Sequence, residues 1–459
     1  MSALHAVPRP SRRTLRVLAL ALVLVSASPA MATVLGVATG SASYDGGVPE
    51  SVPPADGHTV VTVDGIGPGL IAAYAPNGSK VYEADEHRFY HDVDPAPRFG
   101  TASVTYVASH GAAARHCASE DRCRKSQVMR LNVTTGEREE LWARYATPSG
   151  SNNIHDVDFV NDTHLVVAEI SHPDGVYMVN VSADEEVWRW NASEHYDPNA
   201  SGGQYPGDWT HMNDVEYLHD RGLVMASPRN MDSVIFVRPG EGVVENMTLG
   251  SDGDHRTLYE AHNPDFIPAE RGGPAVVVAD SENDRIVEYQ RVDGAWERSW
   301  LWRDGSVQWP RDADRFPNGH TLVTDTHSDR VVEVDEDGDI VWQMRFPGPY
   351  EAERLGTGAE SAGGPSAVEA GLDSRRASGG VLAGVVLAAE DVLPSLLVNG
   401  MLFTLPRWMT PVDAVGMVFA ALFALAWTVG ELGVLVARRR SADADASAES
   451  AESSAPGDD

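Results

Sequence analysis

The sequence predicts an all-β fold, a six-bladed β-propeller with a membrane-directed segment at each end of the chain. Three observations lead to this prediction. The strings GHTVVTVD (57–64) and GHTLVTDT (319–326) are almost identical, a four-strand pattern recurs between them, and long apolar runs lie near both termini. Self-similarity along a chain is the signature of a repeat architecture. The 459 residues leave room for one large β domain and membrane elements.

The repeating unit opens with a short polar string and continues with three more strand-like runs. Units start at positions 91, 155, 211, 262 and 311, and the GHTVVTVD segment supplies a sixth. Runs such as RVVEVDE (330–336) alternate apolar and polar residues, as half-buried strands do, and Asx or Gly turns separate them. Four-stranded units recurring every ~40–50 residues are typical of β-propellers. We therefore expect the propeller over residues 39–350; a β-helix or a sandwich is the alternative.

The N-terminal segment, residues 1–38, has the features of an export signal. Arg12 and Arg13 precede an apolar run from Val17 to Ala38, and together with Ser11 they resemble a twin-arginine motif. The same run is long enough to remain in the membrane. A cleaved signal peptide and an N-terminal membrane anchor both stay open.

Two segments separate the propeller from the C-terminal helix. Residues 351–379 are rich in Gly, Ala, Ser and Glu, which predicts a linker. Residues 380–410 are apolar but contain Glu390, Asp391 and Pro394. We expect this second segment to lie at the membrane surface or beside the last helix.

The C-terminal segment predicts a membrane anchor. Residues 411–437 form an apolar run that fits a transmembrane helix, and Arg438–Arg440 follow it directly. Because positive residues stay on the cytoplasmic side, residues 438–459 should be a disordered acidic cytoplasmic tail. The propeller is then expected outside the cell.

Glycosylation sequons support an external location. Seven Asn-x-Ser/Thr sequons occur, at Asn77, Asn132, Asn161, Asn180, Asn191, Asn199 and Asn246. All of them lie between the two membrane-directed segments. We therefore expect a cell-surface glycoprotein.

The only two cysteines, Cys117 and Cys123, are six residues apart. Outside the cell, a pair this close is expected to form a loop disulfide. Metal binding together with His116 is the alternative.

The composition indicates a salt-adapted protein. The chain has 67 acidic and 35 basic residues, a net charge of −32, and Lys80 and Lys125 as its only lysines. An acidic surface of this kind suits concentrated salt, where self-repulsion is screened, so a halophilic archaeon is the expected source. An acidic intracellular protein is the alternative. Nucleic acid is excluded as a partner because its phosphates would be repelled.

Several imidazoles are expected at one level of the central channel. The first strand of each blade lines the central channel, and equivalent repeat positions hold His91, His155, Asn213, His262 and Arg311. His211 lies two residues before Asn213 and should face the channel with it. Burying imidazoles is costly unless each is hydrogen-bonded, so such a ring indicates a functional site. The neighbouring carboxylates, Asp92, Asp156, Asp214 and Asp312, are expected to point outward and brace the blades.

The segment DWTHMNDVEYL (208–218), together with the strands after it, resembles the aryl sulfotransferase family, the PAPS-independent enzymes of bacterial periplasm. The matching residues are Trp209, His211, Asn213 and, after the next strand, Arg229. The following unit, with His262, is similar to the segment that holds the family's nucleophile. The resemblance covers the propeller and implies a six-bladed fold; the membrane segments lie outside it.

The resemblance implies that a sulfuryl group moves from an aryl sulfate donor to a phenolic acceptor, with no cofactor and no metal. His262 would attack sulfur and form a sulfohistidine, because a neutral imidazole can take up and release this group. Arg229, Asn213 and His211 would stabilise the charge that develops on the sulfuryl oxygens. His155 would transfer the proton and is the competing nucleophile, and Arg311 has no counterpart.

Two other functions fit parts of the sequence. The first is a catalytically silent cell-surface propeller that acts as a binding or scaffold module. The second is a metal-dependent hydrolase, which the imidazole and arginine ring disfavours because such groups are poor ligands for Ca²⁺. The sequence leaves open the donor, the acceptor and the oligomeric state.

Overall fold

The computed structural model describes residues 11–38, 47–64, 69–117, 123–146, 153–170, 173–199, 202–377, 388, 400, 409 and 411–452. The chain forms two compact units. The first comprises Met1–Tyr44, Val381–Val386 and Trp408–Asp459. The second comprises Asp45–Gly380 and Leu387–Arg407.

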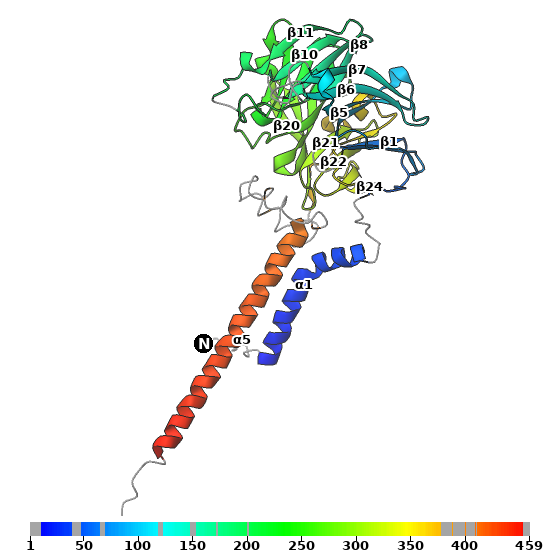
Figure 1. Cartoon of the computed structure of the whole chain (residues 1–459). Helices are drawn as coiled ribbons and strands as arrows, with labels where there is room; N and C mark the ends of the chain where they lie inside the picture. Colours follow the sequence, from blue (N-terminus) through cyan, green and yellow to red (C-terminus); the bar gives the residue numbers. More distant parts are fainter. Residues whose placement is uncertain are drawn as a thin grey trace, which may run out of the picture. The chain divides into compact units, whose positions relative to one another are not determined.

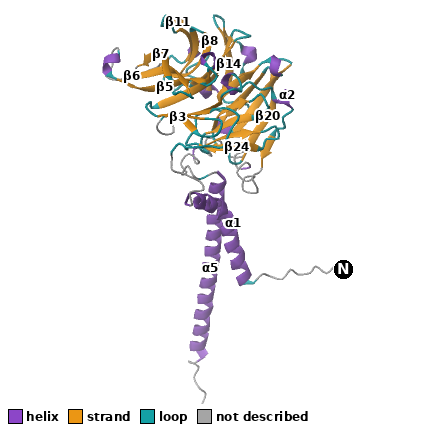
Figure 2. Ribbon diagram, turned by 90° about the vertical axis from the view of Figure 1, so that its right-hand side faces the viewer, coloured by secondary structure: helices purple, strands orange, loops and turns teal. Residues whose placement is uncertain are grey.

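The second unit is a six-bladed β-propeller, so the predicted fold class is confirmed (Figure 1). Six separate sheets of four or five strands follow one another along the chain, and strands joined by a turn pair antiparallel. Figure 2 shows these strands, with loops and short helices between them. Each sheet is one blade, and the strand named first for each blade is the inner strand that lines the channel.

Blades 1 to 3 are four-stranded sheets. Blade 1 is β25 (Glu351–Arg354), β1 (Thr59–Val63), β2 (Leu70–Tyr74) and β3 (Lys80–Ala84). Blade 2 is β4 (Phe89–Pro95), β5 (Ser103–Ala112), β6 (Cys123–Asn132) and β7 (Arg138–Ala146). Blade 3 is β8 (Asn153–Asn161), β9 (His164–Ile170), β10 (Gly175–Asn180) and β11 (Glu185–Asn191).

Blades 4 and 5 carry one additional strand each. Blade 4 is β12 (Met212–Leu218), β13 (Leu223–Pro228), β14 (Ser233–Arg238) and β15 (Gly242–Val243), with β16 (Leu249–Gly250) also on β14. Blade 5 is β17 (His262–Ile267), β18 (Ala275–Asp280), β19 (Arg285–Val292), β20 (Ala295–Asp304) and β26 (Arg375–Ala377). Blade 6 is β21 (Pro310–Arg315), β22 (Thr321–Asp325), β23 (Arg330–Val334) and β24 (Ile340–Arg345).

Short helices connect the strands. The 3₁₀ turns are η1 (Pro97–Phe99), η2 (Ala114–His116), η3 (Ala192–Glu194), η4 (Arg229–Met231), η5 (Glu245–Met247), η6 (Ala269–Arg271), η7 (Ser281–Asn283) and η8 (Ala359–Ser361). Helix α2 (Ala367–Ala370) begins at Ser366, whose side chain caps it by accepting a hydrogen bond from the Glu369 amide.

The ring closes through a strand from the end of the propeller sequence. Strand β25 pairs antiparallel with β1 and forms the inner edge of blade 1. Residues 351–379, expected as a linker, therefore differ from that expectation, because they supply β25, α2 and β26 to the propeller. The acidic composition of the string Glu351-Ala-Glu-Arg354 does not suggest a strand. In the structure its carboxylates face the channel and not solvent.

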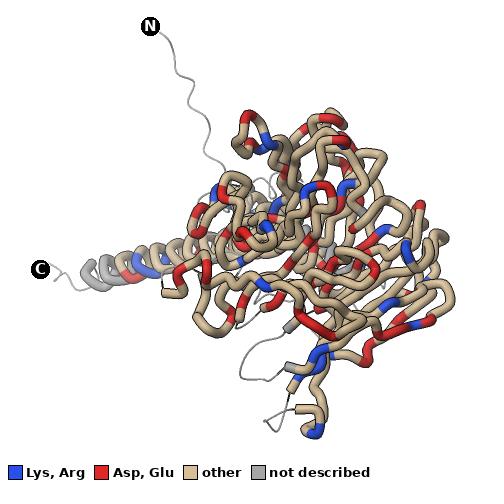
Figure 3. The backbone as a smooth tube through the Cα atoms, turned by 90° about the horizontal axis from the view of Figure 1, so that it is seen from above, with Lys and Arg blue, Asp and Glu red and all other residues tan. Residues whose placement is uncertain are grey.

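Six hydrophobic clusters hold the blades together, one between each pair of neighbours around the ring. Strand β18 is buried along its whole length, which explains its unbroken apolar run AVVVA. A blade is apolar on both faces because it packs against a neighbour on each side, and burying one valine or leucine contributes about 1.5–3 kcal/mol. Figure 3 shows Asp and Glu at many places along the backbone of the propeller.

The first unit contains helices α1 (Arg12–Ala38) and α5 (Pro411–Glu452), which lie side by side (Figure 1). Within the described chain, the segment Val412–Ala444 of α5 is the one helix long and apolar enough to cross a membrane. The helix continues to Glu452, so much of the tail expected to be disordered is helical, in keeping with its many alanines. Most of the expected interfacial segment 380–410 lies outside the described residues.

The side chains of Cys117 and Cys123 are joined by a disulfide, with Cα atoms 5.5 Å apart. Several sequon asparagines also have a local structural role. The Oδ1 atoms of Asn132 and Asn180 accept hydrogen bonds from backbone amides two and three residues further on, as in Asx turns.

Candidate functional site

The inner strand of five blades carries a β-bulge where the sequence predicts a channel residue. The register shifts between Tyr90 and Val93 in β4, and at the matching places in β8, β12, β17 and β21. At a bulge two residues oppose one on the partner strand, and the local direction of the side chains changes. Consecutive residues of the inner strand can therefore both face the channel.

A repeated hydrogen bond between blades defines which residues are equivalent. In four blades the carboxylate that follows the channel residue accepts a hydrogen bond from a backbone amide of the next blade: Asp92 from Val157 (3.1 Å), Asp156 from Val215 (2.5 Å), Asp312 from Ala352 (3.2 Å) and Glu351 from Val93 (2.8 Å). The residue before each carboxylate then occupies one channel level. By this rule Tyr350 of blade 1 stands beside His91, His155, Asn213, His262 and Arg311.

Tyr350 is a site residue that the sequence reasoning missed. It was the last residue of the expected propeller, so no blade was assigned to the string that begins with it. The signal was present, because YEAE (350–353) has the same polar and apolar order as HDVD (91–94).

The predicted direction of the neighbouring carboxylates is wrong. Asp92, Asp156, Asp214 and Asp312 line a buried cavity in the channel and do not point outward. The bulge is the reason, since it turns the residue after the channel position inward as well. Three of the four, Asp92, Asp156 and Asp312, do connect blades through their hydrogen bonds to backbone amides of the next blade.

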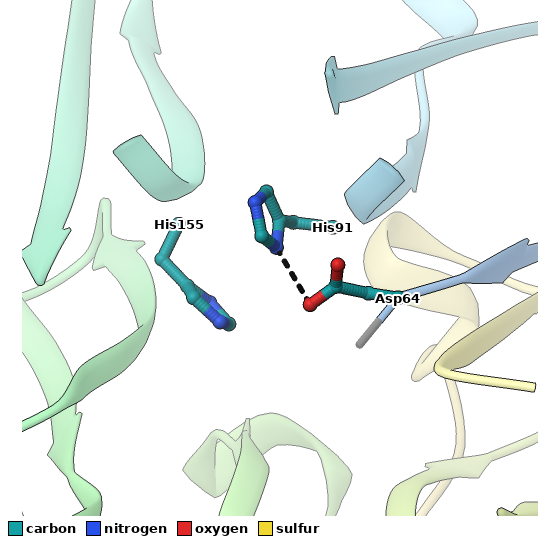
Figure 4. Close-up of side chains that lie close together, drawn as sticks. All are labelled: Asp64, His91 and His155. Carbon is teal, nitrogen blue, oxygen red and sulfur yellow. Dashed lines mark ion pairs between the residues drawn. The ribbon is translucent and has the colours of Figure 1, made fainter. Parts of the chain in front are cut away.

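His91 and His155 are neighbours in the channel, with ring centroids 4.7 Å apart (Figure 4). His91 Nδ1 lies 3.1 Å from Asp64 Oδ2. His155 Nδ1 is 2.7 Å from the carbonyl oxygen of Asn213, to which it must donate, and its Nε2 lies 3.3 Å from the Tyr350 hydroxyl. Burial, and next the two neighbouring imidazoles His91 and His211, lower the pKa of His155 well below its usual range.

His211 lies beside His155, with ring centroids 5.4 Å apart. It precedes β12 with a φ of 50°, a left-handed conformation that is uncommon for a residue other than glycine. Its Nδ1 is 2.5 Å from Asp208 Oδ1. Burial, followed by the charge of Arg229, lowers the pKa of His211 to about 4 although Asp208 acts in the opposite direction.

In blades 5, 6 and 1 the residue two positions before the channel residue also has the left-handed backbone conformation seen at His211. Glu260, Trp309 and Gly348 have φ values of 46°, 52° and 53°. An aspartate of the preceding blade accepts a hydrogen bond from each of their amides: Asp232 from Glu260 (3.0 Å), Asp284 from Trp309 (2.7 Å) and Asp329 from Gly348 (2.7 Å). Strained residues of this kind persist where the surroundings enforce them, often at functional sites. Glu260 and Trp309 were missed, although the two-residue offset that selected His211 also selects them.

His262 is buried, with 1% of its surface exposed. Its Nδ1 lies 2.8 Å from Ser281 Oγ and 3.0 Å from the Glu260 carbonyl oxygen. Because the Ser281 hydroxyl donates to the Pro310 carbonyl (2.7 Å), Nδ1 must carry the proton, and Nε2 keeps its lone pair. Burial, and then Arg311 and Arg229, lower the pKa of His262 well below its usual range.

Two arginines influence the same imidazoles. Arg229 opens η4 and donates from Nε (3.1 Å) and one terminal nitrogen (3.0 Å) to Asn230 Oδ1, with Glu260 3.7 Å away. Arg311 is buried and lies over the rings of Trp309 (4.4 Å) and Tyr350 (4.7 Å). Within the described chain no carboxylate forms an ion pair with Arg311; its one hydrogen bond, at 3.4 Å, goes to the backbone oxygen of Asp64.

The structure thus brings the predicted residues together, and burial keeps their imidazoles neutral. His155 contacts His211 and the Asn213 backbone, while Asn213 Nδ2 reaches Asn263 at 3.3 Å. Such a site offers a nucleophilic nitrogen, cationic donors and an aromatic wall. Asp64, His91 and His155 could also hold a metal, as could groups of carboxylates deeper in the channel.

Comparison with known protein families finds a matching family model. The family model described as arylsulfotransferase (ASST) matches residues 57–347. A search of curated proteins finds no match. Among solved structures, a protein of unknown function from Bacteroides caccae is 15% identical with a TM-score of 0.45, over 64% of this chain and 97% of that one.

Other similar structures belong to proteins with different activities. A periplasmic gluconolactonase from Pseudomonas aeruginosa is 10% identical with a TM-score of 0.42, over 66% of this chain and 99% of that one. Virginiamycin B lyase from Staphylococcus aureus is 8% identical with a TM-score of 0.39, over 67% and 86%. Similarities this low carry no argument about function.

Proposed function

Because this chain belongs to the arylsulfotransferase family, whose model matches residues 57–347, we propose that it moves a sulfuryl group from an aryl sulfate to a phenolic acceptor through a sulfohistidine. The observation that carries the proposal is the state of His262. Its Nδ1 is held by hydrogen bonds, its Nε2 keeps a lone pair, and burial keeps the ring neutral. A neutral, oriented imidazole is the form that can attack sulfur.

The reaction proceeds in two steps. In the first, His262 Nε2 forms a bond to sulfur while the bond from sulfur to the aryl oxygen breaks, and its electron pair leaves on the phenolate. In the second, the acceptor oxygen bonds to sulfur and the N–S electron pair returns to His262. Phenolate is a stable leaving group, so neither step requires a nucleotide.

His211 is the best-placed base for the acceptor proton. Its Nδ1 is held by Asp208 at 2.5 Å, so Nε2 is available, and the carboxylate would stabilise the imidazolium that forms. The sequence resemblance suggests His155 for this step. His155 is less suited, because Tyr350 already engages its Nε2 and its Nδ1 meets only a backbone carbonyl.

Arg229 and Arg311 would stabilise the sulfuryl oxygens. Both act on His262 from the same region of the channel, as their effect on its pKa indicates. Arg311 has no carboxylate partner that would neutralise it in the described chain, and Asn213 adds a neutral donor. The ring of Trp309 offers a surface for the aryl group.

We further propose that the enzyme is anchored in the cell membrane with the propeller outside, in a halophilic organism. The support is the apolar segment Val412–Ala444, which contains Arg438–Arg440 towards its end, together with the sequons and the net charge of −32. The N-terminal segment 1–38 would serve as the export signal or as a second anchor.

Peptide mass analysis after exposure to a chromogenic aryl sulfate tests the mechanism. We expect one sulfuryl group on the peptide that contains His262 in the wild type. The variant His262→Ala should show neither the label nor turnover, because no other group replaces the bond that it makes. The control His164→Ala changes the first residue of β9 and should retain both the label and turnover.

The outcome also separates the alternatives. A label on the His155 peptide that persists in His262→Ala would exchange the roles of the two histidines. Absence of any label and of any turnover in the folded wild type would refute the transferase and leave a binding module.

A further inference from the structure

Deeper in the channel, beyond the level of the imidazoles, lies a buried cavity of about 20 Å³. This volume holds about one water-sized sphere. Ten of its twelve lining residues are carboxylates, and the other two are Val215 and Asn263. No lysine or arginine of the described chain lines it.

The carboxylates come from successive inner strands in two levels. Asp92, Asp156 and Asp312 follow the channel residues directly, and Asp94 and Asp314 lie two residues further along their strands. Glu351 and Glu353 of β25 repeat the same spacing in blade 1. The acidic ring is therefore built by the repeat itself and does not arise from one irregular loop.

Some of these carboxylate oxygens lack partners. Asp265 and Asp314, 7% and 2% exposed, each have an Oδ2 that is buried and makes no hydrogen bond within the described chain. A buried charge without a partner is costly, so such oxygens indicate a missing cation or proton.

The spacing of the oxygens fits a Ca²⁺ ion. Asp94, Glu351 and Glu353 place one oxygen each within 4.8 Å of one another, and so do Asp312, Asp314 and Glu353. Two ligands of one Ca²⁺, each about 2.4 Å from the ion, can be at most about 4.8 Å apart. Mg²⁺ requires shorter distances and keeps several of its waters, for which this cavity has no space.

We propose that this cavity is a Ca²⁺ site with Glu353, the residue common to both groups of oxygens, at its centre, and that the ion joins the inner strands of the propeller. The expectation of no metal rested on the imidazole and arginine level, which is a separate level of the channel. The ion would be structural: it neutralises the carboxylates where blades 1, 2 and 6 meet. Glu360 of η8 also lines the cavity and adds a further oxygen.

Metal analysis and thermal unfolding of the full chain test the site. Protein prepared without chelator should contain about one Ca²⁺ per chain. After EGTA treatment, in molar NaCl held constant so that general screening does not change, added CaCl₂ should raise Tm in proportion to the logarithm of its concentration. The same concentrations of MgCl₂ should have at least tenfold less effect.

The double variant Asp314→Asn, Glu353→Gln keeps the shape of both side chains and removes their charge. It should lose the Ca²⁺-dependent increase in Tm, while its metal-free form unfolds at a higher temperature than the metal-free wild type because repulsion is relieved. The control Asp325→Asn changes a buried carboxylate that already bonds Arg330 (2.7 Å) and the Gln308 amide (2.8 Å). This control should retain the full Ca²⁺ response.

Three results would overturn the proposal: wild-type protein without bound Ca²⁺ and without a Ca²⁺-dependent Tm, an equal response to MgCl₂, or an unchanged response in the double variant. The first would mean that protons neutralise the carboxylates. Because none of these measurements uses turnover, a silent enzyme would not affect the conclusion.

Discussion

Arg311 should matter for catalysis and contribute little to stability. It is a buried cation without a carboxylate partner in the described chain, and burial lowers its pKa, so the fold does not favour its charge. Replacing it with methionine keeps a long apolar side chain over Trp309 and Tyr350 and removes the charge. We expect Arg311→Met to fold normally and to lose most of its turnover.

The magnitudes follow from its contacts. Two cation–π contacts, at 4.4 and 4.7 Å, would be lost, each contributing up to about 2 kcal/mol where water is excluded. Against this, the buried Nε without a partner disappears, which relieves roughly 1–3 kcal/mol. The free energy of unfolding should therefore change by no more than about 3 kcal/mol. Loss of a preorganised donor to the sulfuryl oxygens should lower kcat by about 10²–10³-fold.

Arg315, on the same strand, provides the matched control. It also lies over a tryptophan, Trp300 at 4.8 Å, but it forms an ion pair with Glu288 at 3.4 Å in a fully buried position. Arg315→Met leaves the buried carboxylate of Glu288 without its cation, so it should cost about 3–5 kcal/mol of stability. The folded fraction should retain its kcat.

The assay is turnover of a chromogenic aryl sulfate in high salt, paired with denaturant unfolding of both variants. Because Arg311 also lowers the pKa of His262, the acid limb of kcat/KM in Arg311→Met should shift to higher pH. Normal turnover in Arg311→Met, or a loss of stability as large as that of Arg315→Met, would refute this reasoning.

Four further measurements test the site and its setting. In the wild type, kcat/KM should stay level as pH falls through 6.5, because the imidazoles must be neutral to act and burial lowers the pKa of His211 to about 4. A decline of kcat/KM centred at pH 6.5 would contradict the buried site. Tm should fall when molar NaCl is removed, because the 67 acidic residues outnumber the 35 basic ones and their mutual repulsion is then no longer screened. A constant Tm would argue against salt adaptation. Protease added to intact cells should remove the propeller and spare the tail after Arg440, whereas a protected propeller would reverse the proposed topology. Cys117 and Cys123 should resist thiol labelling until reduced; labelling of the native protein would show that their disulfide is absent.

The repeat made most of the fold predictable from sequence. Counting units that begin with strings such as HDVD located the inner strands, and with them His91 and His155, without any structural information. The ring closure was not predictable in the same way, because the acidic β25 matches the composition of a linker. Its identity depends on pairing with β1, a contact between the two ends of the propeller sequence.

The sequence predicted which residues of the inner strands lie together in the channel, and predicted the directions of their side chains less well; the catalytic role of these residues stays a prediction. Simple alternation of side chains along a strand correctly brought His211 and Asn213 to the channel, but it sent Asp156 outward. The bulge at Ile154–Asp156 reverses that direction, and no local sequence signal predicts this bulge. The left-handed backbone at Trp309 is likewise set by Asp284 of the preceding blade and not by its own preference.

The closing of blade 1 by β25 has a consequence for biosynthesis. Until the ribosome has delivered residues 351–354, β1 presents an unpaired edge of exposed amides and carbonyls, the form of strand most prone to pair with another chain. The acidic side chains of β25 arrive last, so the most repulsive part of the channel assembles only when the rest of the ring is in place. Truncation at position 350 should therefore yield a chain that aggregates during synthesis, even though it contains every histidine of the site.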